Sequence, residues 1–403
     1  MKKYDFTKLL DRHGHDALAV DAIGAGDGFA PDKAKEGFDT VPMWIADMNF
    51  PTADSITDAI IKRAQHPAFG YFEASDEYYQ AIIDWHKERK GVDDLPREAI
   101  GYENGVLGGV LSALKVFASA GDKVLVHSPT YMGFTHVLKD NGYQIVHSPL
   151  KQDENGVWRM DYEDMDKKIK ENQIHVAIFC NPHNPCGRVW TEEEIKKAIE
   201  VYEHNDCWVI SDGIWSDLIL PGHHLTTVQS VSDWAKEHVL AFYAPSKTFN
   251  LAGLIGSYHV IYNKAIRERV ESISAKLVYN SMNVLSEHAL IGAYSAEGKN
   301  WLDQLLPVLQ DNVDLAFSYI DKFDGVTAAR PEGTYMVLLD CQEWLEKHQM
   351  TQPELLKLGW DYGIGWQDGR LFEAPTTFRL NLASPSSQIK KAFDRMDKYV
   401  FNR

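Results

Sequence analysis

The segment Ala244-Pro-Ser-Lys-Thr-Phe-Asn-Leu-Ala-Gly253 places a lysine, Lys247, directly after an apolar run of residues. That run, residues 239–243, is typical of a buried strand, so Lys247 is expected at the mouth of a sheet. A partly buried amine has its charged form disfavoured and becomes a usable nucleophile toward a carbonyl group. Most lysines that follow strands are solvated, so this segment alone does not identify a reactive amine.

Two upstream motifs also follow apolar runs. Residues 181–188 (NPHNPCGR) come after residues 176–180, and Ser211-Asp212-Gly213 closes another apolar stretch. An ordinary proline-rich turn would explain the first motif by itself. Parallel strands end at the same edge of a sheet, so one edge would present both motifs and Lys247.

Strand-like and helix-like segments alternate through the middle of the chain. The segments typical of buried strands are 123–127, 144–148, 175–180 and 207–211, and helical segments such as 162–171 and 192–203 lie between them. This alternation predicts an α/β fold, a mostly parallel sheet sandwiched by helices.

The pattern changes after residue 290. An amphipathic helical stretch at 301–320, with a possible kink at Pro307, precedes strand candidates 334–339 and 378–382 and a closing helix at 387–401. We therefore expect a large domain of residues 45–290 and a smaller α+β domain built from residues 1–44 and 291–403.

Bulk properties narrow the class of protein. The net charge of -17 over 403 residues argues against nucleic-acid binding, which needs a basic face. The apolar runs are too short to span a bilayer, and the N-terminus has no apolar secretion-signal region. The four cysteines match no zinc spacing, which predicts reduced thiols in a cytoplasmic protein without a metal site; they are Cys180, Cys186, Cys207 and Cys341.

Taken in order, the three motifs resemble those of the fold-type I pyridoxal 5'-phosphate (PLP) enzymes, the aspartate aminotransferase superfamily. The resemblance implies that Asn184 bonds the phenolic oxygen of the cofactor, that Asp212 pairs with its pyridine nitrogen, and that Lys247 forms the Schiff base. A carboxylate beside the ring nitrogen keeps it protonated, which makes the ring a better electron sink.

The phosphate of such a cofactor needs hydrogen-bond donors. The stretch Asn104-Gly-Val-Leu-Gly-Gly109 opens an apolar helix, and free N–H groups at a helix N-terminus form an anion site. A simple turn before a helix is the alternative. The resemblance assigns the phosphate to Gly105, Val106 and Leu107, with a hydroxyl contributed by Ser246.

Two further residues take roles from the resemblance. Tyr131 follows a predicted strand and would stack its ring on the pyridine face, although a packed tyrosine is the plainer interpretation. Arg379 lies in the apolar segment 378–382, where a buried cation should face an anion. A bidentate guanidinium suits the α-carboxylate of an amino-acid substrate, and a structural ion pair is the alternative.

The resemblance narrows to the MalY/PatB-type cystathionine β-lyases through residues 42–51 (PMWIADMNFP), Phe69-Gly-Tyr71, Trp85 and the Lys247 segment. It implies cleavage of L-cystathionine or related cysteine thioethers to pyruvate, ammonia and a thiol, as in methionine biosynthesis. Trp44 lies on the segment that approaches the substrate in relatives. Tyr71 would cross a dimer interface to the phosphate of the other subunit, which implies a homodimer with shared active sites.

The chain also departs from the subfamily pattern. The usual S-D-E-I-H-x-D becomes Ser211-Asp-Gly-Ile-Trp-Ser-Asp217, so Gly213 and Trp215 replace Glu and His. An indole N–H at Trp215 can donate to the phenolic oxygen of the cofactor but cannot accept or titrate. Ile255 occupies the position where aminotransferases tend to have a cation near the phosphate. A class I/II aminotransferase and a regulatory binding protein of the same fold therefore remain alternatives.

Overall fold

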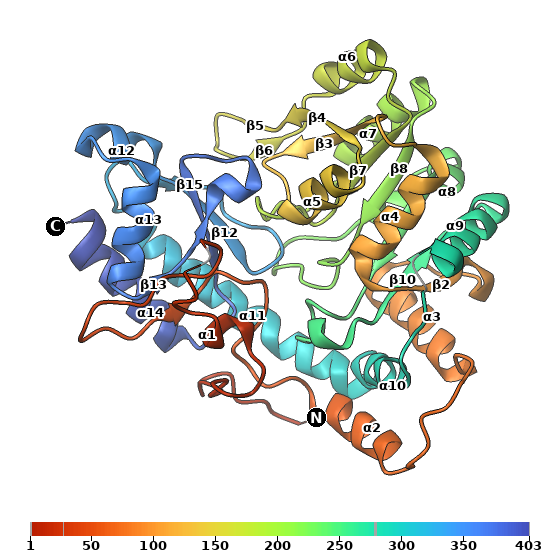
Figure 1. The fold of residues 1–403 in the computed structure, drawn as a ribbon, viewed down its shortest axis with the longest axis horizontal. Coiled ribbons are helices and arrows are strands. Elements are labelled where there is room, and N and C mark those ends of the chain that lie inside the picture. Colours follow the sequence, from red (N-terminus) through yellow and green to blue (C-terminus); the bar gives the residue numbers. More distant parts are fainter. Residues whose placement is uncertain (1, 27, 278–279, 403) are drawn as a thin grey trace.

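The computed structural model describes residues 2–26, 28–277 and 280–402. Its centre is a seven-stranded sheet in the order β2-β10-β9-β8-β7-β3-β4 (Figure 1). The five strands from β9 to β4 run parallel, and β10 runs antiparallel to both of its neighbours. The prediction of a mostly parallel sheet is confirmed. The strands are β2 (Ile100–Glu103), β3 (Lys123–Ser128), β4 (Gln144–Pro149), β7 (Val176–Cys180), β8 (Trp208–Asp212), β9 (Val239–Tyr243) and β10 (Ser257–Val260).

Helices cover both faces of this sheet because successive strand residues point to opposite sides. In β7, Val176 and Ile178 belong to a core cluster with α4, α5 and α9, whereas Ala177 and Phe179 belong to a cluster with α6, α7 and α8. These helices are α4 (Gly105–Phe117), α5 (Met132–Asp140), α6 (Tyr162–Asn172), α7 (Glu192–His204), α8 (Asp233–His238) and α9 (Lys264–Leu277).

A second, four-stranded antiparallel sheet, in the order β11-β12-β15-β14, forms from the C-terminal part of the chain. The long helix α11 (Ala296–Ile320) begins earlier than predicted and contains Pro307 without interruption. The closing helix is divided into α14 (Ser386–Arg395) and a π-helical turn. The strands are β11 (Thr327–Ala328), β12 (Met336–Asp340), β14 (Gln367–Asp368) and β15 (Thr377–Asn381).

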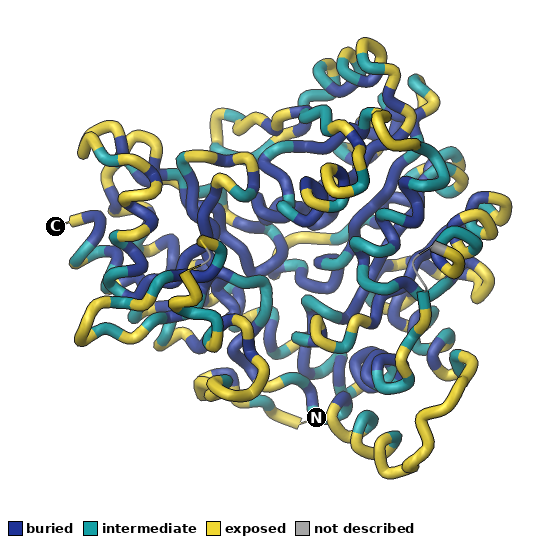
Figure 2. Tube along the Cα trace, in the orientation of Figure 1, coloured by how far each residue is buried: buried dark blue, intermediate teal, exposed yellow. Residues whose placement is uncertain are grey.

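The N-terminal segment lies against this C-terminal part, as Figure 1 shows in red and blue, and β1 (Val41–Pro42) pairs with β13 (Ile364–Gly365). Residues 64–73, which connect two helices, form a continuous exposed stretch (Figure 2). The remaining elements are α1 (Leu18–Asp21), α2 (Asp54–Ala64), α3 (Asp76–Lys90), α10 (Val284–Ala293), α12 (Gln342–His348), α13 (Gln352–Asp361), β5 (Lys151–Gln152) and β6 (Trp158–Arg159).

Two features are absent from the described residues. None of their helices is both long and apolar enough to cross a membrane. Across the same ranges, no group of three or more His, Cys, Asp or Glu side chains is placed to hold a metal ion.

Candidate active site

The three motifs meet at the carboxyl ends of neighbouring strands. Asp212 is the last residue of β8, Asn184 follows β7 and Lys247 follows β9. All three line one cavity of about 200 Å³. The same cavity is lined by Gly105, Val106, Leu107, Tyr131, Trp215 and Ser246, so most of the residues expected at a cofactor site are brought together.

The amine of Lys247 is positioned at the cavity by a hydrogen bond. Nζ donates a hydrogen bond to the carbonyl oxygen of Ala46 at 2.9 Å. Burial, and secondarily the charge of Arg379, lower the pKa of Lys247 to about 8 against the opposing effect of Asp47 and Asp212. About one amine in ten is then neutral at pH 7, compared with about three in ten thousand for an ordinary lysine. Lys247 is therefore a usable nucleophile and base near neutral pH.

Asp212 is a buried carboxylate, with 3% of its surface exposed. Burial raises its pKa to about 6, although the backbone N–H of Ile214, which donates to Oδ1 at 2.9 Å, and the charge of Lys247 lower it. No lysine or arginine of the described ranges forms an ion pair with it. An ionised but poorly compensated carboxylate is suited to bind a protonated ring nitrogen.

Helix α4 points its N-terminus into the cavity. It begins at Gly105, whose φ of +76° lies in the left-handed region that favours glycine. Its first turn contains no acidic residue, so the free N–H groups around Val106 and Leu107 remain available to an anion. Ile255 lines the same cavity and adds no charge.

Tyr131 forms a wall shared by this cavity and a neighbouring one. A Cβ atom at Gly133 would lie 2.4 Å from the Tyr131 ring, so the glycine makes room for that ring. Burial raises the pKa of the Tyr131 hydroxyl, which keeps it protonated.

Arg379 is buried and oriented by two hydrogen bonds. Nη1 donates to Oδ1 of Asn184 at 3.2 Å, and Nη2 donates to the carbonyl oxygen of Trp44 at 3.0 Å. Its Nε has no hydrogen-bond partner among the residues that the structure describes, and burial lowers the pKa of Arg379 to about 10. No carboxylate among the described residues forms an ion pair with Arg379. The alternative of a structural ion pair is therefore not found among those residues.

The segment around Trp44 contributes mainly backbone carbonyl oxygens to the site, through Trp44 and Ala46. The indole of Trp44 is buried and donates to the carbonyl oxygen of Ala19 at 3.0 Å. Arg12 forms an ion pair with Asp47, and Asn381 donates to the carbonyl oxygen of Ile45 at 2.7 Å. Sequence reasoning missed these supports because no motif links residue 12 or 381 to this segment.

The two departures from the subfamily pattern have different structural settings. A Cβ atom at Gly213 would lie 2.5 Å from the ring of Tyr243. The hydroxyl of Tyr243 accepts a hydrogen bond from Nε2 of Gln229 at 2.8 Å, which fixes the ring position. The Tyr243 ring therefore occupies the space that a glutamate would need. Trp215 is buried and contacts the Tyr335 ring edge to face, with 4.8 Å between centroids, while Nζ of Lys247 lies 5.9 Å from the Trp215 ring.

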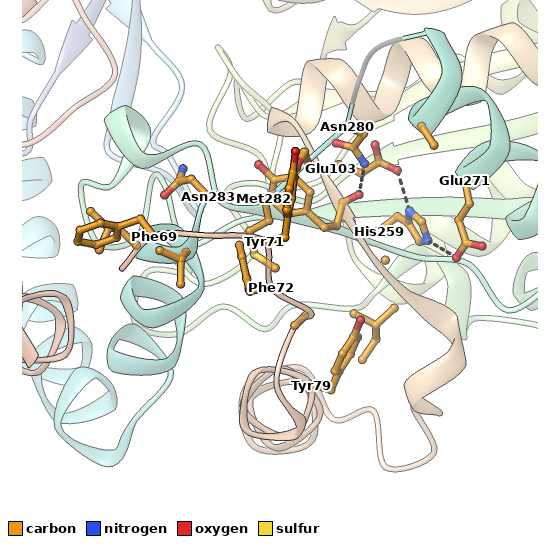
Figure 3. A pocket seen from close by; sticks show the side chains of 18 of the residues that line it. Phe69, Tyr71, Phe72, Tyr79, Glu103, His259, Glu271, Asn280, Met282 and Asn283 are labelled. Carbon is orange, nitrogen blue, oxygen red and sulfur yellow. Dashed lines mark hydrogen bonds and ion pairs between the residues drawn. The ribbon is translucent and has the colours of Figure 1, made fainter. Parts of the chain in front are cut away.

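Trp44 and Arg379 line the neighbouring cavity instead of the 200 Å³ one, and Tyr71 lies away from both in the protomer. Tyr71 is fully exposed, beside the partly exposed Phe69 and Phe72. These residues line a separate cavity of about 910 Å³. Figure 3 shows this cavity, which also contains the buried pair of His259 and Glu103, 2.7 Å apart.

The residues of the 200 Å³ cavity fit PLP. The amine of Lys247 suits its aldehyde, the carboxylate of Asp212 suits its ring nitrogen, and the N-terminus of α4 suits its phosphate. Tyr131 supplies an aromatic face. The donor set contains one group for each functional end of the cofactor.

The comparisons with known proteins point to one family. The profile described as "Aminotransferase class I and II" matches residues 42–396. Cystathionine beta-lyase PatB from Bacillus subtilis (strain 168) is 33% identical, over 88% of this chain and 89% of its own. Protein MalY from Escherichia coli (strain K12) is 28% identical, over 96% of each chain.

Solved structures agree with these sequence relatives. Cystalysin from Treponema denticola, whose crystal structure contains pyridoxal 5'-phosphate, superimposes with a TM-score of 0.90 at 28% identity, covering 99% of both chains. The PLP-bound C-S lyase from Staphylococcus hominis gives a TM-score of 0.88 at 26% identity, covering 100% of this chain and 99% of its own. The chain therefore belongs to the aminotransferase class I and II family, as a fold-type I PLP enzyme of the MalY/PatB type.

Proposed function

We propose that this protein is a PLP-dependent carbon–sulfur β-lyase. It would cleave L-cystathionine or a related cysteine thioether to pyruvate, ammonia and a thiol. The observation that carries the proposal is the meeting of Lys247, Asp212 and the N-terminus of α4 in one cavity. The names of PatB and of the C-S lyase from Staphylococcus hominis support this reaction type.

When bound, PLP supplies an electron sink for the charge left on the α-carbon of the substrate. Asp212 would bind the ring nitrogen and Asn184 the phenolic oxygen. Gly105, Val106 and Leu107 would hold the phosphate through their backbone N–H groups, with the hydroxyl of Ser246.

The substrate would be oriented by Arg379. Its unpartnered Nε and its fixed guanidinium plane suit a bidentate contact with the α-carboxylate. Lys247, with a pKa of about 8, would then accept the α-proton, and Tyr131 would line the ring face. Departure of the thiolate from the β-carbon completes the elimination, and hydrolysis of the released enamine gives pyruvate and ammonia.

An aminotransferase is the second candidate function, because these early steps are common to both reactions. The family profile favours it, as does the aspartate aminotransferase of Sulfurisphaera tokodaii, which is 24% identical over 91% of each chain. One product assay separates the two. L-Cystathionine should give pyruvate, ammonia and homocysteine without any added 2-oxo acid, and strict dependence on an oxo acid would establish transamination instead. Absence of turnover in both formats would leave a regulatory binding protein.

We also propose that the active unit is a homodimer in which Tyr71 reaches the phosphate site of the partner subunit. The support is the exposed aromatic cluster of Phe69, Tyr71 and Phe72 along the 910 Å³ cavity (Figure 3). Such clusters mark interaction surfaces, and a two-fold dimer presents the same patch twice. A charge-assisted bond from Tyr71 to phosphate is worth about 1.5–3 kcal/mol, or about 10- to 100-fold in cofactor retention.

Mixing Tyr71→Phe protein with Lys247→Ala protein tests this arrangement. If the site is shared, each heterodimer contains one site with both its lysine and its tyrosine, and activity should partly return. If each subunit uses its own tyrosine, mixing should restore nothing. A Tyr79→Phe variant, altered on the same surface, serves as the control for a general interface effect.

Three coarser features complete the proposal. We assign residues 45–290 to a large cofactor-binding domain and residues 1–44 with 291–403 to a small domain. We place the protein in the cytoplasm, where homocysteine released from cystathionine would supply methionine biosynthesis. Expression of this gene in a methionine auxotroph that lacks its own β-lyase should restore growth, which checks the role in methionine biosynthesis. Fractionation of the cells checks the cytoplasmic location.

A further inference from the structure

A second cavity, of about 570 Å³, continues from the active site. It shares Ala46, Leu107, Tyr131 and Lys247 with the 200 Å³ cavity, so the two are contiguous. We call it the outer chamber. It extends to the C-terminal end of helix α5, which lies beside α4 (Figure 1).

One face of α5 forms a wall of the outer chamber. The lining residues Gly133, His136, Val137 and Asp140 are spaced as neighbours on one helical face. Gly133 packs against the ring of Tyr131, at the active-site end. At 1.5 Å per residue, Asp140 lies about 10 Å farther along the helix.

The charges of the outer chamber are segregated. Lys247 and Arg379 lie at its inner end, and they are the only lysine or arginine residues among the described residues that line it. Asp140 is its one acidic lining residue within the described ranges. An amino acid whose carboxylate binds Arg379 would therefore meet negative charge at the far end of its side chain.

Asp140 is an exposed carboxylate at the C-terminal end of a helix. It is the last residue of α5, where the helix dipole already contributes negative charge. It forms no ion pair with any cation in the described part of the chain. A positively charged group entering the outer chamber would relieve both effects.

We propose that the outer chamber holds the distal end of the substrate side chain and that Asp140 selects a distal ammonium group over a carboxylate. The proposal rests on the lyase function above and specifies its substrate class. L-Cystathionine carries such an ammonium six bonds from its reacting α-carbon, a reach of about 7 Å when extended, and the distal carboxylate on the same carbon would face away from Asp140. Adding one hydrogen bond of about 2.8 Å gives about 10 Å, comparable with the rise along α5 from Gly133, beside Tyr131, to Asp140.

Isothermal titration calorimetry of the PLP-loaded protein tests this selection without relying on turnover. L-Lysine, L-norleucine and L-2-aminoadipate have side chains of similar length ending in an ammonium, a methyl and a carboxylate, and none has a leaving group on its β-carbon. Wild-type protein should bind L-lysine more tightly than L-2-aminoadipate. Asp140→Asn should weaken L-lysine binding by about 2- to 5-fold, the range for exposed ion pairs, and leave L-norleucine unchanged.

Two further variants complete the experiment. Asp140→Lys should reverse the order of L-lysine and L-2-aminoadipate. Glu154→Gln removes an exposed carboxylate outside the outer chamber and should alter none of the three affinities. The proposal is overturned if wild-type protein does not bind L-lysine, if Asp140→Asn leaves the ratio of L-lysine to L-norleucine affinity unchanged, or if Glu154→Gln changes it equally.

The lyase function is judged separately, by release of pyruvate from L-cystathionine by wild-type protein. Loss of lysine selectivity in Asp140→Asn without pyruvate release in the wild type would refute the lyase and keep the charge selection. Pyruvate release by wild-type protein, with unchanged lysine selectivity in Asp140→Asn, would support the lyase and refute the charge selection.

Discussion

Replacing Asp212 by asparagine should stabilise the cofactor-free protein while weakening its hold on PLP. The carboxyl group is buried, and its pKa is raised from 3.8 to about 6. A raised carboxyl pKa means that the folded state binds more protons than the unfolded state between these two values. Stability is therefore lost as the pH rises through this window, and the full penalty persists above it. Asparagine removes the charge and can keep the bond from the Ile214 N–H through its amide oxygen.

The shift sets the size and the pH dependence of the effect. A pKa raised by about two pH units corresponds to about 3 kcal/mol of penalty at pH 8, and about half of that penalty remains at pH 5. Asp212→Asn should therefore raise the free energy of unfolding by amounts of this order, with the gain at pH 8 about twice the gain at pH 5. The carboxylate that costs stability in the cofactor-free protein is the group proposed to bind the ring nitrogen.

Urea unfolding of PLP-stripped wild type and variant, followed by tryptophan fluorescence at one protomer concentration, measures this difference. Titration of PLP into the same samples measures the expected loss of cofactor affinity. Asp206→Asn, on an exposed turn, serves as a control for a change of one charge. A variant that is less stable than wild type at pH 8, or a difference that does not change with pH, would refute the reasoning.

The remaining predictions concern neighbours of the site. Lys90 and Asp217 form a buried ion pair, so Lys90→Met should lower the free energy of unfolding in urea by about 3–5 kcal/mol. Adding Asp217→Asn should recover part of that loss. A loss below about 1 kcal/mol, as expected for an exposed pair, would contradict this prediction. Gly213→Ala should cost about 1–3 kcal/mol through overpacking against Tyr243, and the companion change Tyr243→Leu should reduce that cost; equal costs in both backgrounds would contradict it. Trp215→Tyr should shift the pH midpoint of the visible absorption of the PLP-loaded protein, because a phenol donates and accepts whereas an indole only donates; an unchanged midpoint would mean that Trp215 only packs.

The sheet was predictable because its information is local. Each buried strand is a short apolar run. The observed bounds of β3, β4 and β7 differ from the predicted ones by one residue at one end, and those of β8 by one residue at each end. The meeting of Asn184, Asp212 and Lys247 follows from the geometry of parallel strands, since each residue ends or follows such a run. The family assignment drawn from these motifs is confirmed by the profile match and by the relatives.

Contacts between distant segments could not be predicted in this way. The carbonyl oxygen of Ala46 accepts from Lys247 across 201 positions of sequence, and a backbone acceptor has no sequence signature. The exclusion of a side chain at Gly213 depends on the ring of Tyr243, thirty positions farther along the chain. The α5 wall of the outer chamber has the right helical spacing, but only packing shows that this face meets the active site rather than solvent.

The overall charge of the chain also gave no guide to the charge of its site. The protein carries -17 in total, yet the cations Lys247 and Arg379 lie near the active-site carboxylate Asp212, with Asp140 at the far end of the outer chamber and Asp47 paired with Arg12. The pKa values of Lys247, Arg379 and Asp212 move toward the neutral form, with burial as the largest cause. Groups strained in this way gain most from a ligand that restores their charge partners: a ring N–H for the acid and a substrate carboxylate for the arginine. Burial thus disfavours the charged forms of these residues unless such partners are bound, which is the arrangement expected of a site for PLP and an amino acid.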